Sequence, residues 1–225
     1  MENETIANDA LVNINGDQVP TLELLLMLTL ISLLPSLLIM CTSFLRTIIM
    51  LTFLRNAMGI QQSPPNMVLV GIALFLTLYI MTPVINEINE TAYQPYVREE
   101  ITQQEAWTRA QVPLKEFMLR NTEEDTLNLF MDMGNAEAVE QAVDLPLTIV
   151  IPSFMTTELK RAFTAGFLLY IPFLLIDIIV SSTLMSMGMM MLPPTTISMP
   201  FKILLFVLAD GWNLIIVNLM KTFVR

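Results

Sequence analysis

Three long stretches of this chain carry no charged side chain. Leu24 to Leu45 holds 22 uncharged residues, Asn56 to Asn86 holds 31, and Ile178 to Phe201 holds 24. About 20 apolar residues are enough to cross the hydrocarbon core of a bilayer as a helix. These stretches therefore predict an all-α, membrane-associated chain in which apolar helices are the dominant elements.

The charged residues are few, and most of the net charge lies in one region. Charged residues make up 14% of the chain, against roughly 25% in an ordinary soluble domain, and the mean hydropathy is +0.63. The net charge is −10, and the segment from Glu87 to Asp144 holds thirteen acids against four bases. A chain this acidic is not expected to bind nucleic acid, because phosphate contacts need a basic surface.

The residue types that usually carry catalysis are missing. There is no histidine, which removes the usual general base and the commonest metal ligand. The single cysteine, Cys41, lies in an apolar run, so we expect a small buried side chain and no intrachain disulfide. No phosphate-binding loop, nucleophile elbow or metal-ligand spacing occurs. We expect neither an enzyme nor a bound cofactor or metal.

The pattern of apolar and polar segments divides the chain into four parts. Residues 1–21 form an acidic tail, and residues 22–86 form a first apolar hairpin whose first helix has a kink at Pro35. Residues 87–150 form an acidic extramembrane segment with helical spacing of apolar residues. Residues 151–225 form a second apolar hairpin of one long helix, a proline-rich connection and one last helix.

The positions of the basic residues predict conflicting orientations of the chain in the membrane. Arg46 and Arg55 flank a stretch without acids, which predicts a loop on the cytoplasmic side and the acidic segment on the outer side. Four simple crossings would then place Lys202 inside, as expected. They would also place four basic residues outside, against the positive-inside rule: Lys160, Arg161, Lys221 and Arg225. The conflict indicates that these helices are not ordinary bilayer spans in the assembled protein.

Three charged residues, Asp177, Lys202 and Asp210, interrupt the second apolar half. A charge in hydrocarbon costs about 2.5–3.5 kcal/mol even on the most lenient scale, so such side chains face protein or water. A proton or ion relay is one interpretation. A buried ion pair or a subunit contact is favoured about threefold in a chain without histidine. The hairpin turn between Asp177 and Lys202 makes these two the preferred pair.

Five of the seven residues from Met185 to Met191 are methionine, and two prolines follow closely. Methionine is unbranched and soft, so a cluster of it forms a wall that deforms and closes again. Plain packing is the first interpretation, and Cu(I) binding through Met187, Met189 and Met190 is the second and weakest. The third is a flexible constriction that excludes water and ions by dewetting.

Two long segments resemble a known family. They are RTIIMLTFLRNAMGIQQSPPNMVLVGIALFLT (Arg46 to Thr77) and FMTTELKRAFTAGFLLYIPFLLIDIIVSSTLMSMGMMMLPPTTISMPFKILLFVLADGW (Phe154 to Trp212). Both closely resemble the FliP/SctR family of export-gate proteins of bacterial type III secretion systems. The resemblance covers nearly the whole chain after the tail. The flagellar branch fits better than the virulence injectisome branch, which remains the alternative.

The resemblance implies a specific function and assembly. Members of the family form a five-copy helical ring with FliQ and FliR, with FlhB around its base, inside the flagellar basal body of the inner membrane and partly on its periplasmic side. Unfolded flagellar proteins pass through the centre. The methionine gasket of the family corresponds here to Met189, Met190 and Met191, with Met187 beside it. The family has an N-terminal signal peptide, and because this sequence opens without a basic n-region, we expect that such a peptide has been removed.

Two rival functions remain open from the residues alone. A small-molecule or metal transporter would place a polar substrate site at mid-membrane, built from interrupted helices. Asp177 and the prolines fit that interpretation weakly, because no clustered polar set accompanies them. A structural membrane scaffold without a conduit is the other rival. Under that interpretation, cross-linkers on the methionine run would trap no secreted protein.

Overall fold

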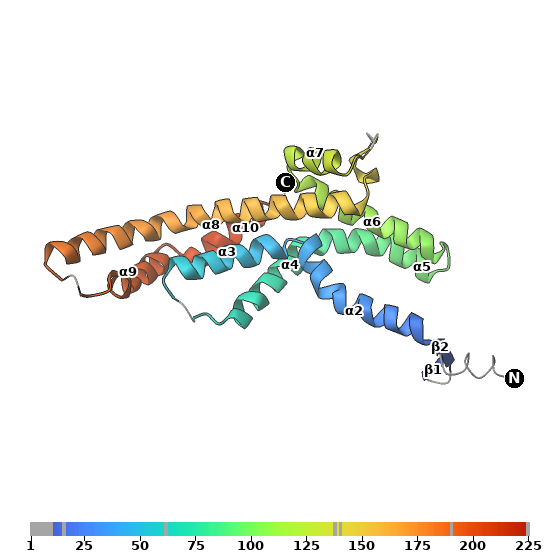
Figure 1. The fold of residues 1–225 in the computed structure, drawn as a ribbon, viewed down its shortest axis with the longest axis horizontal. Helices are drawn as coiled ribbons and strands as arrows, with labels where there is room; N and C mark the ends of the chain where they lie inside the picture. Colours follow the sequence, from blue (N-terminus) through green and yellow to red (C-terminus); the bar gives the residue numbers. More distant parts are fainter. Residues whose placement is uncertain are drawn as a thin grey trace. The chain divides into compact units, whose positions relative to one another are not determined.

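The chain is described by a computed structural model that covers residues 11–14, 17–60, 63–136, 139, 141–189 and 191–223. Helices dominate it, which confirms the all-α expectation apart from a two-stranded hairpin in the tail (Figure 1). The elements are β1 (Leu11–Ile14), β2 (Asp17–Pro20), α2 (Thr21–Cys41), α3 (Phe44–Ala57), α4 (Asn66–Ile88), the π-helical turn η1 (Asn89–Tyr93), α5 (Gln94–Val97), α6 (Gln103–Arg120), α7 (Glu124–Met133), the 3₁₀ turn η2 (Ala142–Asp144), α8 (Leu147–Ser186), α9 (Pro194–Leu208) and α10 (Gly211–Lys221).

The chain divides into two compact units, residues 1–39 and residues 40–225. In the first unit, β1 and β2 pair antiparallel with Val12 opposite Val19, and α2 follows directly. The apolar side chains of α2 are largely exposed, with Leu25 and Leu28 each 67% accessible. The unit therefore buries little apolar surface of its own. Residues 1–10 of the predicted acidic tail lie outside the described residues.

The second unit is built along the 40-residue helix α8. Helix α3 runs beside α8, α4 packs on α3, and α6 and α7 cover the N-terminal part of α8 (Figure 1). The largest cluster of buried side chains joins α4, α6 and α8 through Met81, Phe117 and Phe154. A second cluster joins α3, α8, α9 and α10 through Leu54, Phe173, Phe206 and Ile215. These two clusters hold the helices of the second unit together.

The packing of α3 against α8 at Phe53 depends on Gly166. A Cβ atom at this position would lie 2.6 Å from Cγ of Phe53, whose ring also packs edge-on against Phe163 at 5.4 Å and Tyr170 at 6.4 Å. Because three aromatic rings meet here, Phe53 has little room to move. Only glycine lets the two helices lie this close at that point.

Replacing Gly166 by alanine is expected to destabilise the chain by about 1–3 kcal/mol, the usual cost of forcing extra volume into a packed core. The matched control is Gly71→Ala, because Gly71 is also helical and a Cβ there meets no atom within 4 Å. That substitution should be neutral or stabilise by about 0.5–1 kcal/mol. Detergent-resistance and SDS unfolding curves of the purified variants measure both. Equal unfolding curves for Gly166→Ala and Gly71→Ala would contradict the close packing of α3 on α8 at Gly166.

Two predicted features of the chain are wrong. The segment between Arg46 and Arg55 is no loop, because both residues lie within helix α3. The final apolar segment is not one helix, because it breaks between Leu208 and Gly211, and α9 and α10 are bent by 64°. Asp210 sits at this break with φ +49°, a left-handed conformation that aspartate tolerates better than most residues. Hydropathy alone detects neither a buried arginine nor a bend between two equally apolar halves.

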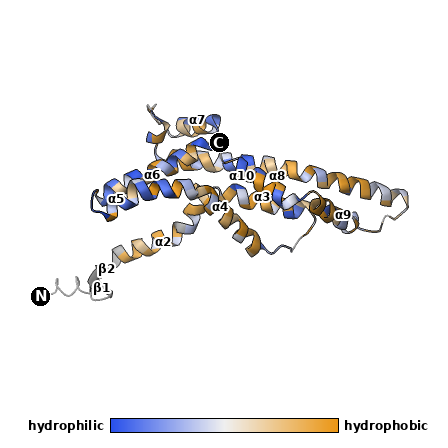
Figure 2. Ribbon diagram, turned by 180° about the vertical axis from the view of Figure 1, so that it is seen from behind, coloured by the Kyte–Doolittle hydropathy of each residue, from blue (hydrophilic) through white to orange (hydrophobic). Residues whose placement is uncertain are grey.

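Within the described residues, two continuous helical stretches are long and apolar enough to cross a membrane, Asn66–Val97 and Leu147–Ser186. The number rises to four if Leu24–Leu33 with Pro35–Cys41 and α9 with α10 each count as one bent span. In α8, only 11% of the most apolar window is buried within the chain. Figure 2 shows hydrophobic residues along much of the ribbons of α8 and α9, and many of their large hydrophobic side chains are exposed. Exposed apolar area on this scale is covered by lipid or by other chains.

Candidate functional site

The methionine run forms the connection between α8 and α9. Helix α8 ends at Ser186, and the N–H of Gly188 donates to the carbonyl of Met185 while the N–H of Met189 donates to that of Leu184. This pair of bonds is a Schellman cap, which requires a left-handed residue after the helix. Gly188 supplies it with φ +74°. The methionines therefore stand on a loop whose entry is fixed by backbone hydrogen bonds.

The described methionine side chains of this loop point away from the chain's own core. Met187 is 67% exposed, Met189 43% and Met191 99%. Met190 lies outside the described residues. A soft, exposed apolar loop at the end of a long hairpin is available to contact other chains. No group of three or more His, Cys, Asp or Glu side chains is placed to hold a metal ion in the described part of the chain.

A buried polar cluster supports the hairpin below the loop. Lys202 Nζ lies 2.6 Å from Asp177 Oδ2, which is the ion pair predicted from the position of the turn. Ser198 Oγ donates to Asp177 Oδ1 at 2.6 Å, and Lys202 Nζ also donates to the Ala57 carbonyl at 3.1 Å. Lys202 is 4% exposed and Ser198 is fully buried. The cluster thus ties α8, α9 and the C-terminal turn of α3 together, and a cation at a helix C-terminus is favourable.

Asp210 does not belong to this cluster. Its side chain is exposed in the break between α9 and α10, where it accepts a hydrogen bond of 3.1 Å from Asn213 Nδ2. Asp210 is therefore not buried within its own chain, and its predicted role in a subunit contact stays a prediction. Its carboxylate reaches water because the helix turns away there.

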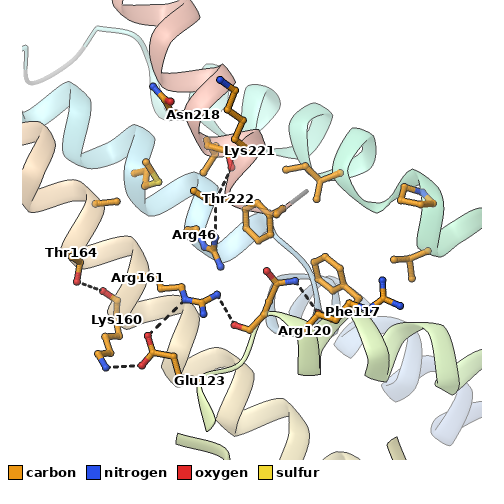
Figure 3. A pocket seen from close by; sticks show the side chains of 18 of the residues that line it. Arg46, Phe117, Arg120, Glu123, Lys160, Arg161, Thr164, Asn218, Lys221 and Thr222 are labelled. Carbon is orange, nitrogen blue, oxygen red and sulfur yellow. Dashed lines mark hydrogen bonds and ion pairs between the residues drawn. The ribbon is translucent and has the colours of Figure 1, made fainter. Parts of the chain in front are cut away.

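Arg46 forms the centre of a second buried network (Figure 3). Its guanidinium makes a bidentate ion pair with Glu158 of α8, with Nε to Oε2 at 2.9 Å, and both side chains are almost fully buried. Nη1 donates to Thr222 Oγ1 at 2.8 Å, and the guanidinium carbon lies 3.8 Å from the ring centre of Phe223. Burial lowers the pKa of Arg46, and the positive charge of nearby Arg161 lowers it further. The hydrogen bond to Glu158 acts in the opposite direction.

Each of the two polar networks, the Asp177–Lys202 cluster and the Arg46 network, contains a residue that the sequence did not predict. Ser198 was missed, although it lies one turn before Lys202 on the same face of α9. Glu158 was also missed, although it is the only acid between Asp144 and Asp177. Lys160 and Arg161 follow Glu158 closely, so the sequence does not single out Arg46 as its partner. Arg55, the other predicted loop residue, donates to Asn66 Oδ1 at the start of α4, and no acid in the described part of the chain pairs with it.

These features define a class of protein: a helical membrane subunit with exposed apolar faces, buried ion pairs between its helices and a soft methionine loop. The FliP family model matches residues 27–219. Similar proteins include flagellar biosynthetic protein FliP of Bacillus subtilis (strain 168), 51% identical over 203 residues that cover 90% of this chain and 92% of that protein. The FliP of Aquifex aeolicus (strain VF5) is 48% identical over 210 residues, 92% of this chain and 88% of that protein. The FliP of Pectobacterium carotovorum subsp. carotovorum is 46% identical over 211 residues, with 93% and 82% covered. This chain belongs to the FliP family.

Proposed function

We propose that this chain is a subunit of the flagellar type III protein export gate, the core channel through which unfolded flagellar proteins cross the inner membrane. The observation that carries this is the match to the FliP family over residues 27–219, together with relatives named as flagellar biosynthetic proteins. The chain is needed for flagellum assembly. It catalyses no reaction, so other components supply the energy for export.

The proposed assembly follows from the resemblance and has support in the exposed apolar faces. Five copies form a ring with FliQ and FliR, and FlhB joins at the base, in the basal body and partly on the periplasmic side. The apolar surfaces of α2, α8 and α9 supply area for such contacts. In this scheme residues 22–86 and 151–225 are the two apolar hairpins, residues 87–150 face the periplasm, and residues 1–21 form the tail.

In the closed gate, Met189, Met190 and Met191 form the gasket, and Met187 supports it. The exposure of Met189 and Met191 on a capped loop favours this role, because these side chains find no cover within their own chain. A ring of thioether side chains keeps a narrow path free of water and ions and parts around a passing chain. The Asp177–Lys202 pair then fixes the hairpin that presents the loop.

Replacing Met189, Met190 and Met191 together by alanine is expected to make cells that express the complex leak ions, because the shorter side chains no longer close the path. Whole-cell potassium efflux and membrane potential measure the leak. The matched control is Met67→Ala with Met133→Ala, since both methionines are exposed, at 83% and 72%, outside the loop. No difference in leak between the triple variant and this control would remove the gasket assignment.

A further inference from the structure

Two charges in the apolar part of the second unit form no ion pair with any described residue. They are Arg55, in the last turn of α3, and Asp210, at the break between α9 and α10. The other charges of these helices are mostly paired: four form the two buried ion pairs between helices, and Lys160 and Arg161 pair with Glu123. Because a charge in an apolar segment is costly, Arg55 and Asp210 need partners from outside the chain.

Glu87 and Lys221 also lack an ion pair among the described residues, but their surroundings are polar. Both lie near the ends of their helices and line a cavity of about 1200 Å³ beside the acidic segment, where other charged side chains gather (Figure 3). Arg55, in contrast, stands before 31 uncharged residues, and Asp210 has no charged neighbour within seven positions. The two charges are therefore set apart from the polar segment.

Arg55 is not neutralised by its contacts within the chain. Its Nη1 donates to Asn66 Oδ1 and, at 3.4 Å, to the Pro64 carbonyl, and both acceptors are uncharged. Its Nε has no hydrogen-bond partner among the described residues. The side chain is partly exposed, and the exposed apolar residues Met67 and Val68 follow Asn66. A carboxylate of another chain can thus reach the guanidinium on an apolar surface.

Asp210 is the counterpart of Arg55 in sign and setting. Its carboxylate is exposed, accepts one hydrogen bond from Asn213 Nδ2 at 3.1 Å and caps no N–H of α10. Val207, Leu208 and Leu214, close to it in the sequence, are exposed apolar side chains. Apolar residues that exclude water from a few central polar contacts are typical of protein interfaces.

Both charges lie beside the apolar cluster that joins α3, α8, α9 and α10 (Figure 1). Leu54, directly before Arg55, belongs to this cluster. So do Phe206 and Ile215, which stand on either side of Asp210 in the sequence. Yet Arg55 turns to the start of α4 and Asp210 to α10, and the two form no ion pair with each other. The second unit thus holds an unpaired cation and an unpaired acid at one level, directed at different neighbours.

We infer that Arg55 of one copy pairs with Asp210 of the next copy, so that each chain gives its cation to one neighbour and its acid to the other. A second copy is the partner because this chain supplies both halves of the pair, each on an apolar surface, and such surfaces are complementary. A contact between two different surfaces of the same chain closes into a ring when the rotation allows. The inference rests on the ring of the proposed function and names a contact that holds it together.

The first test cross-links the complex purified from membranes, with the buried Cys41 replaced by alanine in every chain. Chains with Arg55→Cys are co-expressed with chains with Asp210→Cys and treated with a short bis-maleimide, because an arginine side chain holds the two backbones too far apart for a direct disulfide. The mixture should give cross-linked dimers, and each variant expressed alone should give none. The mixture also keeps contacts in which Arg55 of one kind of chain meets Asp210 of the other, so assembly survives the substitutions.

The second test reverses the charges and counts copies by native mass spectrometry. Arg55→Glu and Asp210→Arg should each lower the yield of multi-copy complex about tenfold, because like charges that face each other across an interface are strongly unfavourable. The double variant should bring the yield back to within about threefold of the unchanged chain, since the coupled residues again attract. The matched controls are Arg109→Glu and Asp132→Arg, at exposed positions of the acidic segment, and they should leave the yield unchanged.

Dimers from chains that carry only Arg55→Cys would overturn the inference, because they would place two copies of the same surface together. So would the absence of dimers in the mixture, cross-linking from position 55 to a protein other than this chain, or a double charge reversal no better than the worse single one. If several copies are still counted in that case, the ring of the proposed function stands and only its contact is wrong. A single copy in the purified complex would contradict both.

Discussion

Replacing Arg46 by methionine is expected to lower the free energy of unfolding by about 3–5 kcal/mol, because it leaves the buried carboxylate of Glu158 without its cation. The variant also loses the hydrogen bond to Thr222 and the contact with the Phe223 ring. Both losses act on the end of α10, so we expect that end to detach first. SDS unfolding of the purified chain measures the stability, and hydrogen exchange of the last residues measures the detachment.

The double variant Arg46→Met with Glu158→Met tests the cause. A buried ion pair replaced by apolar side chains of similar volume is often neutral or stabilising, so the double variant should recover most of the loss. Arg109→Met removes an exposed pair whose side chains are 45% and 49% accessible, and it should cost about 0.2–1 kcal/mol. A double variant as unstable as Arg46→Met alone would show that packing, and not the unpaired charge, dominates.

Replacing Lys202 by methionine is expected to have the second largest effect on the free energy of unfolding. The loss should not exceed about 3–5 kcal/mol, because Asp177 is partly exposed and water screens its charge. The substitution removes the ion pair and the bond to the Ala57 carbonyl, so α3 keeps its apolar packing on the hairpin but loses this polar contact. Export of flagellar proteins should fall with it, since the methionine loop lies at the end of that hairpin. Secretion assays and SDS unfolding measure the two effects.

Ser198→Ala separates the hydrogen bond from the charge. It removes one donor to Asp177 but keeps Lys202, so the expected cost is about 1 kcal/mol. Asp177→Asn with Lys202→Met should regain stability relative to Lys202→Met, because no unpaired carboxylate remains. Stability that stays at the level of Lys202→Met would contradict the assigned pairing.

The parts of the fold that the sequence predicts are those set by long uncharged runs. The apolar helices and the Asp177–Lys202 pair follow from segment length and from a turn between two helices, both of which are local. Hydropathy does not predict the bent last helix, because both of its halves are apolar, and the one signal of the break is the turn-forming dipeptide Asp210-Gly211. The role of Arg46 depends on Glu158, 112 residues away, and no local pattern carries that distance.

The bend at Asp210 restricts where α9 and α10 sit. The first N–H groups of α10 have no partner within the helix, and Asp210 supplies no side-chain cap. Unpaired donors of this kind cost several kcal/mol each in hydrocarbon. Water or neighbouring polypeptide must therefore accept hydrogen bonds from these N–H groups. The apolar segment of α9 and α10 is thus not an isolated bilayer-spanning helix. Counting its residues as a span overstates how much of the protein touches lipid.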